Sequence, residues 1–235
     1  ANRVAIDLLI QQLYEAKLLA TVEATALVDD MPRLEAARVP IEQWLADGSI
    51  TARLFFEDGD DYEAALRLIA GHGYRLERAD RGQHWYARVY RGVTQRIVMR
   101  LGLSESGSQF ALNDPSTDII VHRGHSHSLG RTFDPRLGAR GDVTKLLLGG
   151  SCGSFGGMTT PEFLSAFGGH LMLADNDAGE ATVNGPLLLK ILDGVADRKG
   201  GWDEYGLDEY VSKSGILLPN DPAFAVMRRM QAAAP

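Results

Sequence analysis

The stretch KLLLGGSC, Lys145 to Cys152, decides the fold of this chain. Its three consecutive leucines are apolar at every position, which is typical of a strand buried on both faces of a parallel sheet. Two other short runs have the same character, DIIV at 118–121 and HLMLAD at 170–175. These runs predict three neighbouring parallel strands with helices covering both faces of the sheet.

The surrounding segments supply the other elements of an α/β fold. Residues 50–74 read as a strand, an acidic turn and a helix that stops at Gly71, and residues 84–101 read as a hairpin that turns at RGVT. The segment 104–116 predicts a loop. Helices are expected at 160–169, with Thr160 as the N-cap and Pro161 at the first position, and over 184–201.

The N-terminal part of the chain has a different character. Five apolar residues recur at helical spacing, and they are Ile6, Leu9, Ile10, Leu13 and Tyr14. The pattern changes near Gly48 to Ile50, where strand-like sequence begins. We therefore expect a helical segment over 1–48, which is regulatory or the remnant of an upstream domain, and one further domain over 49–235.

Composition excludes several classes of protein. The chain has 235 residues and a formal net charge of −7, which argues against a nucleic-acid partner because phosphate binding needs clustered Lys and Arg. No apolar run approaches the roughly 20 residues that span a bilayer, so no membrane insertion is expected. Cys152 is the single cysteine, so an intrachain disulfide is excluded. We expect a cytoplasmic protein, with a secreted or periplasmic location as the alternative because the chain starts with Ala.

An imidazole and a thiol follow two of the predicted strands. His125 comes after DIIV and Cys152 comes after KLLL, and the carboxyl ends of parallel strands meet at one edge of a sheet. A thiol beside an imidazole is an arrangement that nucleophilic catalysis uses. Glycines around Cys152, at 149, 150, 153, 156 and 157, allow backbone N–H groups to approach an oxyanion closely.

Three other interpretations of these residues stay open. His122, His125 and His127 are all nitrogen donors that could bind zinc, although the spacing H-x-x-H-x-H completes no known zinc motif. Gly149, Ser151 and Gly153 spell G-x-S-x-G, the nucleophile pattern of α/β-hydrolases, but that fold requires a catalytic His downstream of the serine. A lone cysteine at a strand end is also often a small buried apolar residue.

The two blocks IIVHRGHS and LLLGGSC resemble those of the caspase-like cysteine peptidases of clan CD, which include caspases, legumain, gingipains, separase and the bacterial CHAT domains. The resemblance implies a caspase-haemoglobinase-like three-layer sandwich with a mostly parallel central sheet. It implies His125 as the catalytic base and Cys152 as the nucleophile. Ser126 stands where the family usually has glycine after the His, and an alternative mapping takes His122 as the base, followed by Gly124.

The resemblance further implies a cysteine endopeptidase, a hydrolase that acts on protein or peptide substrates without a cofactor or a metal. Its oxyanion would be held by backbone N–H groups at Gly124, Ser126 and Gly153. A zinc-dependent hydrolase and a catalytically inactive caspase-like scaffold are the alternatives.

The acidic stretch LADNDAGEA, which follows the third strand, bears on specificity. Asp175 and Asp177 would line the pocket for the residue before the scissile bond, which predicts cleavage after Arg or Lys. An ordinary solvated turn is the other interpretation of this stretch.

Overall fold

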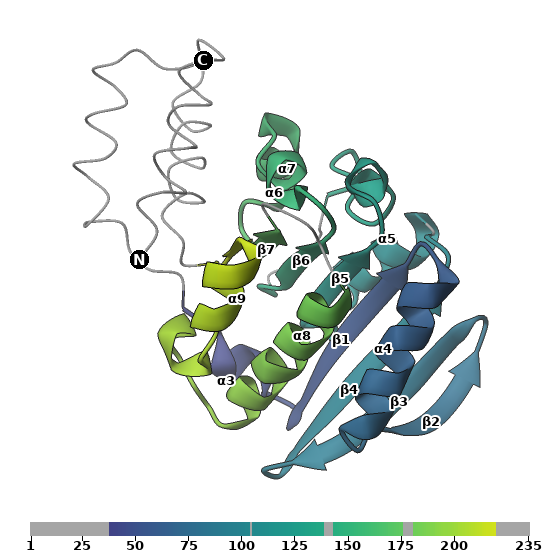
Figure 1. Ribbon diagram of the computed structural model, residues 1–235, viewed down its shortest axis with the longest axis vertical. Helices are drawn as coiled ribbons and strands as arrows, with labels where there is room; N and C mark the ends of the chain where they lie inside the picture. Colours follow the sequence, from purple (N-terminus) through teal and green to yellow (C-terminus); the bar gives the residue numbers. More distant parts are fainter. Residues whose placement is uncertain (1–37, 104, 139–142, 176–180, 220–235) are drawn as a thin grey trace. The chain divides into compact units, whose positions relative to one another are not determined.

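The computed structural model describes residues 38–103, 105–138, 143–175 and 181–219 of the chain (Figure 1). The chain divides into two compact units, one of residues 1–37 with 219–235 and one of residues 38–218. The second unit carries the fold that follows. The helix predicted around Ile6 to Tyr14 lies outside the described residues.

An eight-stranded mixed sheet forms the centre of the second unit, with the strand order β2-β3-β4-β1-β5-β6-β7-β8. The strands are β1 (Ser49–Phe56), β2 (Arg75–Asp80), β3 (Gln83–Tyr90), β4 (Val93–Leu101), β5 (Ile119–Arg123), β6 (Leu146–Gly150), β7 (Leu171–Asp175) and β8 (Ile216–Leu217). Strands β4, β1, β5, β6 and β7 are parallel to their neighbours in this group. The hairpin β2-β3 extends one edge antiparallel, and β8 closes the other edge antiparallel.

Helices connect these strands and cover both faces of the sheet. They are α3 (Ile41–Trp44), α4 (Gly59–Gly71), α5 (Glu105–Asn113), α6 (Ser154–Met158), α7 (Pro161–Phe167), α8 (Ala181–Ala196) and α9 (Asp208–Ser214), with short 3₁₀ turns η2 (Ser126–Arg131) and η3 (Trp202–Tyr205). Helices α4 and α8 lie side by side on one face of the sheet in Figure 1. The α/β class and the mostly parallel sheet are therefore confirmed, and the layering is compatible with a three-layer sandwich.

The core follows from the apolar runs of the sequence. Every residue of β1, β5, β6 and β7 is buried, and Leu146, Leu147 and Leu148 have no exposed surface. A strand that is covered on both faces gains stability from apolar side chains at every position, which is why these runs do not alternate with polar residues.

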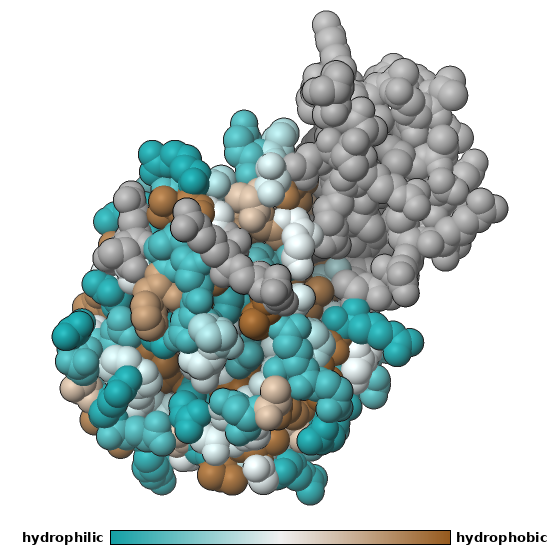
Figure 2. Space-filling model, turned by 180° about the vertical axis from the view of Figure 1, so that it is seen from behind, coloured by the Kyte–Doolittle hydropathy of each residue, from teal (hydrophilic) through white to brown (hydrophobic). Residues whose placement is uncertain are grey.

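Apolar side chains also reach the surface at scattered positions. Exposed examples are Val89, Phe110 and Leu76. Figure 2 shows mainly hydrophilic side chains over the face of the described residues that it presents. Isolated exposed apolar residues of this kind are normal for a folded domain.

Three local predictions are confirmed. The hairpin turns at Arg91 and Gly92, whose φ angles of 53° and 79° are both positive, as the tight two-residue turn between right-twisted strands requires. Helix α4 ends at Gly71, and Thr160 caps α7 by accepting a hydrogen bond from the N–H of Phe163 at 3.3 Å.

The predicted loop at 104–116 is wrong, because most of it forms helix α5. Its serines and glycine are weak helix formers, but Ala111 and Leu112 are fully buried and Gly107 packs closely against side chains of β1 and β4. Packing of one helix face against the sheet therefore overrides the local preference.

Residues 38–48 pack with the sheet unit, although the sequence analysis groups them with the N-terminal segment. The N–H of Val39 donates to the carbonyl of Gly200 at 3.1 Å, and the indole N–H of the buried Trp44 donates to the carbonyl of Thr144 at 2.7 Å. No helix within the described part of the chain is long and apolar enough to cross a membrane.

Candidate active site at the ends of β5 and β6

The structure places His125 and Cys152 at equivalent positions on neighbouring strands. Strands β5 and β6 are parallel, and Arg123 is paired with Gly150 at their carboxyl ends. His125 and Cys152 each follow two residues after this pair, and both are exposed. Adjacent strands lie about 4.8 Å apart, so the segments that carry His125 and Cys152 leave the sheet side by side at this edge.

The segment that carries Cys152 is fixed by the glycines around it. A side chain at Gly149 would meet Met158 at 2.6 Å and Ser154 at 2.8 Å, and one at Gly150 would meet the carbonyl of His122 at 2.9 Å. Gly153 has a φ of 62°, the left-handed conformation that glycine adopts without strain. Close packing at Gly149 and Gly150 and the sharp turn at Gly153 therefore explain why these three residues are glycines.

Ser151, the serine of the G-x-S-x-G pattern, has no exposed surface. Its hydroxyl has no hydrogen-bond partner within the described residues. The adjacent thiol of Cys152 is exposed and free. This difference in exposure favours the cysteine over the serine as the nucleophile of this turn.

The three histidines occupy different environments. His122 is completely buried, with Nδ1 at 2.9 Å from the hydroxyl of Thr132 and Nε2 at 3.2 Å from the carbonyl of His125. Burial lowers the pKa of His122 to about 4, so this imidazole is neutral near pH 7. His125 and His127 are exposed, and their rings stack with centroids 5.2 Å apart.

These environments bear on the zinc interpretation and on the alternative mapping. Both ring nitrogens of His122 already have partners, so neither is free for a metal or a substrate. Within the described residues, no group of three His, Cys, Asp or Glu side chains is arranged to hold a metal ion. His125 is therefore better placed than His122 to act as a base at this edge.

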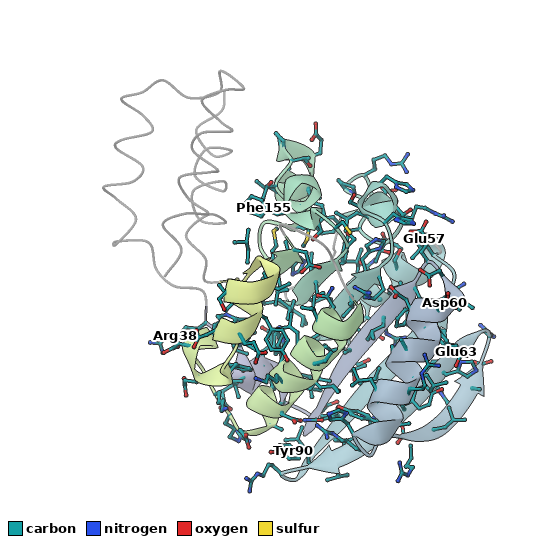
Figure 3. The ribbon with its side chains drawn as sticks, viewed as in Figure 1. Arg38, Glu57, Asp60, Glu63, Tyr90 and Phe155 are labelled. Atoms are coloured by element: carbon teal, nitrogen blue, oxygen red, sulfur yellow. The ribbon has the colours of Figure 1, made fainter. Side chains whose placement is uncertain are left out.

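The sequence analysis missed Glu57, which follows β1 and holds the His125 turn in place. Its carboxylate accepts hydrogen bonds from the backbone N–H of His125 at 2.8 Å and from the hydroxyl of Ser128 at 2.7 Å. Burial acts in the opposite direction, but these two hydrogen bonds and the nearby imidazoles hold the pKa of Glu57 below its ordinary value. Figure 3 shows Glu57 at the same edge of the sheet as Phe155 of α6.

Gly124 is required by this contact. A Cβ atom at Gly124 would collide with the side chain of Glu57. Because Glu57 occupies the N–H of His125, that group is not available to an oxyanion. The N–H groups of Gly124, Ser126 and Gly153 remain the expected donors.

Of the two acidic residues expected in a substrate pocket, only Asp175 is described. Asp175 is the last residue of β7 and is completely buried, with one carboxylate oxygen accepting from Nδ2 of Asn184 at 3.0 Å. Burial raises the pKa of Asp175 to about 7. Asp177 lies outside the described residues.

A cavity of about 330 Å³ lies between α4, α8 and the sheet. Its walls are mostly apolar side chains of these elements, such as Phe56, Leu68 and Val121. Its polar lining consists of Asp61, Arg123 and Asn184.

No model of a known protein family matches this chain, and no curated protein matches it. Function must therefore be argued from the site itself.

Proposed function

We propose that this protein is a cysteine endopeptidase of the caspase-like, clan CD type. The observation that carries the proposal is the equivalent placement of an exposed imidazole and an exposed thiol at the ends of two adjacent parallel strands. The resemblance of the two sequence blocks to that family requires this placement. The mostly parallel sheet with helices on both faces is compatible with the caspase-haemoglobinase architecture that the resemblance implies.

In this proposal Cys152 attacks the carbonyl carbon of the scissile peptide bond as a thiolate. A bond forms between its sulfur and that carbon, the C–N bond breaks, and His125 donates a proton to the leaving amine. Water then attacks the thioester, which releases the carboxylic acid and restores the thiol. The exposed position of His125 suits a group that must exchange protons with substrate and water.

The oxyanion of each tetrahedral intermediate requires hydrogen-bond donors that are already in place. Backbone N–H groups at Gly124, Ser126 and Gly153 are proposed for this task. Glu57 supports it indirectly, because its bond to the N–H of His125 fixes the conformation of the turn that carries Gly124 and Ser126.

Specificity for Arg, and next for Lys, before the scissile bond is the finer part of the proposal. Asp175 is the last residue of β7 and Asp177 comes two positions later in the sequence, and a carboxylate at the base of a pocket would attract a basic side chain and repel an acidic one. Asp175 has no exposed surface, so Asp177 is the carboxylate proposed to meet the basic side chain of the substrate.

Cleavage of a peptide library by the purified protein tests the proposal. We expect His125→Ala to lower the cleavage rate by about 100-fold or more, the range typical of a lost general acid, and His127→Ala to lower it less. A library cut after Arg and Lys supports the pocket, and one cut after Asp or small apolar residues contradicts it.

Two outcomes would point to the alternatives. Loss of cleavage in His122→Ala but not in His125→Ala would favour the other mapping of the base. Activity that is lost to a chelator and restored by zinc would favour a zinc-dependent hydrolase, and no cleavage of any library would favour an inactive scaffold.

A further inference from the structure

We propose that Arg123 is a positioning residue for the nucleophile, and that with Asp61 it ties the segment preceding Cys152 to the first turn of α4. This inference rests on the proposed peptidase function. Arg123 makes no contact with the substrate in this proposal, and its role is to fix the position of the Cys152 thiol.

The geometry joins three elements through one side chain. Arg123 is the last residue of β5, and its guanidinium donates from Nη1 to the carbonyl of Gly150 at 2.6 Å and from Nη2 to the carboxylate of Asp61 at 2.7 Å. The side chain of Arg123 is 6% exposed. Gly150 stands two residues before Cys152, so the guanidinium holds the final peptide of β6 just before the chain turns.

Gly150 leaves room for the side chain of Arg123 as well as for the carbonyl of His122. A Cβ atom at Gly150 would lie 3.0 Å from Cδ and 3.1 Å from Nη1 of Arg123. The register Arg123–Gly150 places the arginine directly opposite the missing side chain. Because Gly150 on β6 has no side chain, the long side chain of Arg123 on β5 can pack against it.

The surroundings make this contact rigid. The ion pair of Arg123 and Asp61 lines the cavity whose other walls are largely apolar, and hydrogen bonds between charged groups are stronger where water is scarce. The carboxyl of Asp175 also lies within electrostatic reach of the guanidinium. A rigid guanidinium between β1–α4 and β6 fixes the direction of the peptide between Gly150 and Ser151.

A second buried arginine of the same sheet provides a matched control. Arg53 on β1 forms an ion pair with Asp114 at 2.8 Å, and its side chain is 10% exposed. It also donates to the hydroxyl of Thr117 at 2.8 Å. These partners precede β5 in the chain, at the edge of the sheet away from Cys152, so removing Arg53 disturbs a comparable buried pair without touching the nucleophile segment.

The test is inactivation of the full-length protein by a peptidyl acyloxymethyl ketone, with the maximal rate of inactivation measured separately from the inhibitor concentration at half-maximal rate. We expect Arg123→Met to lower the maximal rate by about 100-fold, the scale expected from a misplaced reacting group, with little change in the half-maximal concentration. Arg123→Lys should recover part of the rate, because an ammonium can still donate to the Gly150 carbonyl. Arg53→Met should react at the wild-type rate under conditions where it is folded.

Other outcomes separate this inference from the proposed function. A wild-type rate in folded Arg123→Met, or an equal loss in Arg53→Met, overturns the positioning role. Absence of labelling at Cys152 in the wild-type protein overturns the proposed function instead. Should Arg123→Met fail to fold, Asp61→Asn gives the same test, because it keeps the shape of the partner and removes its charge. We expect a loss of about 10-fold there, and a folded variant at full rate contradicts the inference.

Discussion

Replacement of Asp175 by asparagine should flatten the dependence of stability on pH. Asp175 is completely buried, and burial raises its pKa to about 7 from an ordinary value of 3.8. Since the folded carboxyl holds its proton more tightly than the unfolded one, its contribution to stability is complete below pH 3.8. The contribution is lost as the pH rises through 7.

The magnitude follows from this difference in pKa. At 1.36 kcal/mol per pKa unit, the interval between 3.8 and 7 corresponds to about 4 kcal/mol, of which more than half is lost between pH 5 and pH 8. An asparagine can still accept the hydrogen bond from Nδ2 of Asn184, but it does not titrate. The Asp175→Asn variant should therefore lack this loss.

Urea denaturation at pH 5 and pH 8, followed by circular dichroism, measures the effect. The quantity to compare is the change in unfolding free energy between the two pH values, because any constant cost of the substitution cancels in that difference. Asp118 immediately precedes β5, and burial also raises its pKa to about 7. It therefore gives an independent second case. An Asp175→Asn variant that loses as much stability as the wild type between pH 5 and pH 8 would refute the reasoning.

Three further predictions concern the same edge of the sheet and its core. The buried His122 contributes stability that is present above pH 6.5 and lost as the pH falls through about 4, so in acid titrations followed by circular dichroism the wild type should lose stability relative to His122→Asn between pH 6.5 and pH 4. Gly124→Ala should force Glu57 away from the His125 turn, costing about 1–3 kcal/mol in urea denaturation and slowing peptide cleavage. Gly130→Ala, where a Cβ atom meets open space, should leave cleavage unchanged. Leu148→Ala should lower the unfolding free energy by about 2–5 kcal/mol, and a loss below 1 kcal/mol would contradict the packing described for β6.

The parallel core could be predicted from sequence because strands that are buried on both faces are apolar at consecutive positions. The runs IIV at 119–121 and LLL at 146–148 contain no polar position that could face water, so their composition alone predicts burial. Helix α5 could not be predicted in the same way. Its serines and glycine are poor helix formers, and the helix depends on the burial of Ala111 and Leu112 in the folded domain.

The candidate site was predictable in part. His125 and Cys152 are proposed to carry the chemistry, and their positions after two apolar runs were enough to predict that they lie at one edge of the sheet. Glu57 and Arg123 were missed because their roles depend on contacts across strands. A signal for Arg123 did exist, since a charged residue at the end of a buried strand needs a partner.

The glycines around Cys152 show the limit of reasoning from local sequence. The sequence analysis related them to oxyanion binding, which requires close approach of backbone N–H groups. In the structure Gly149 makes room for Met158 and Ser154, and Gly150 makes room for Arg123. A cluster of glycines identifies a crowded turn, but the neighbours that crowd it come from other elements.

The central claim is that the thiol of Cys152 forms a covalent bond with the substrate, and intact-mass spectrometry of an acyl-enzyme tests it most directly. The protein is mixed with peptide esters that carry Arg, Lys, Asp or Leu at the reacting position and is quenched in acid. Its intact mass is measured, and it is then digested to locate the adduct. We expect one acyl group per chain, attached to Cys152 and formed fastest from the Arg ester, and no adduct on the Cys152→Ala variant. Peptide cleavage that persists in Cys152→Ala, or an acyl group attached to any other residue, would contradict the account.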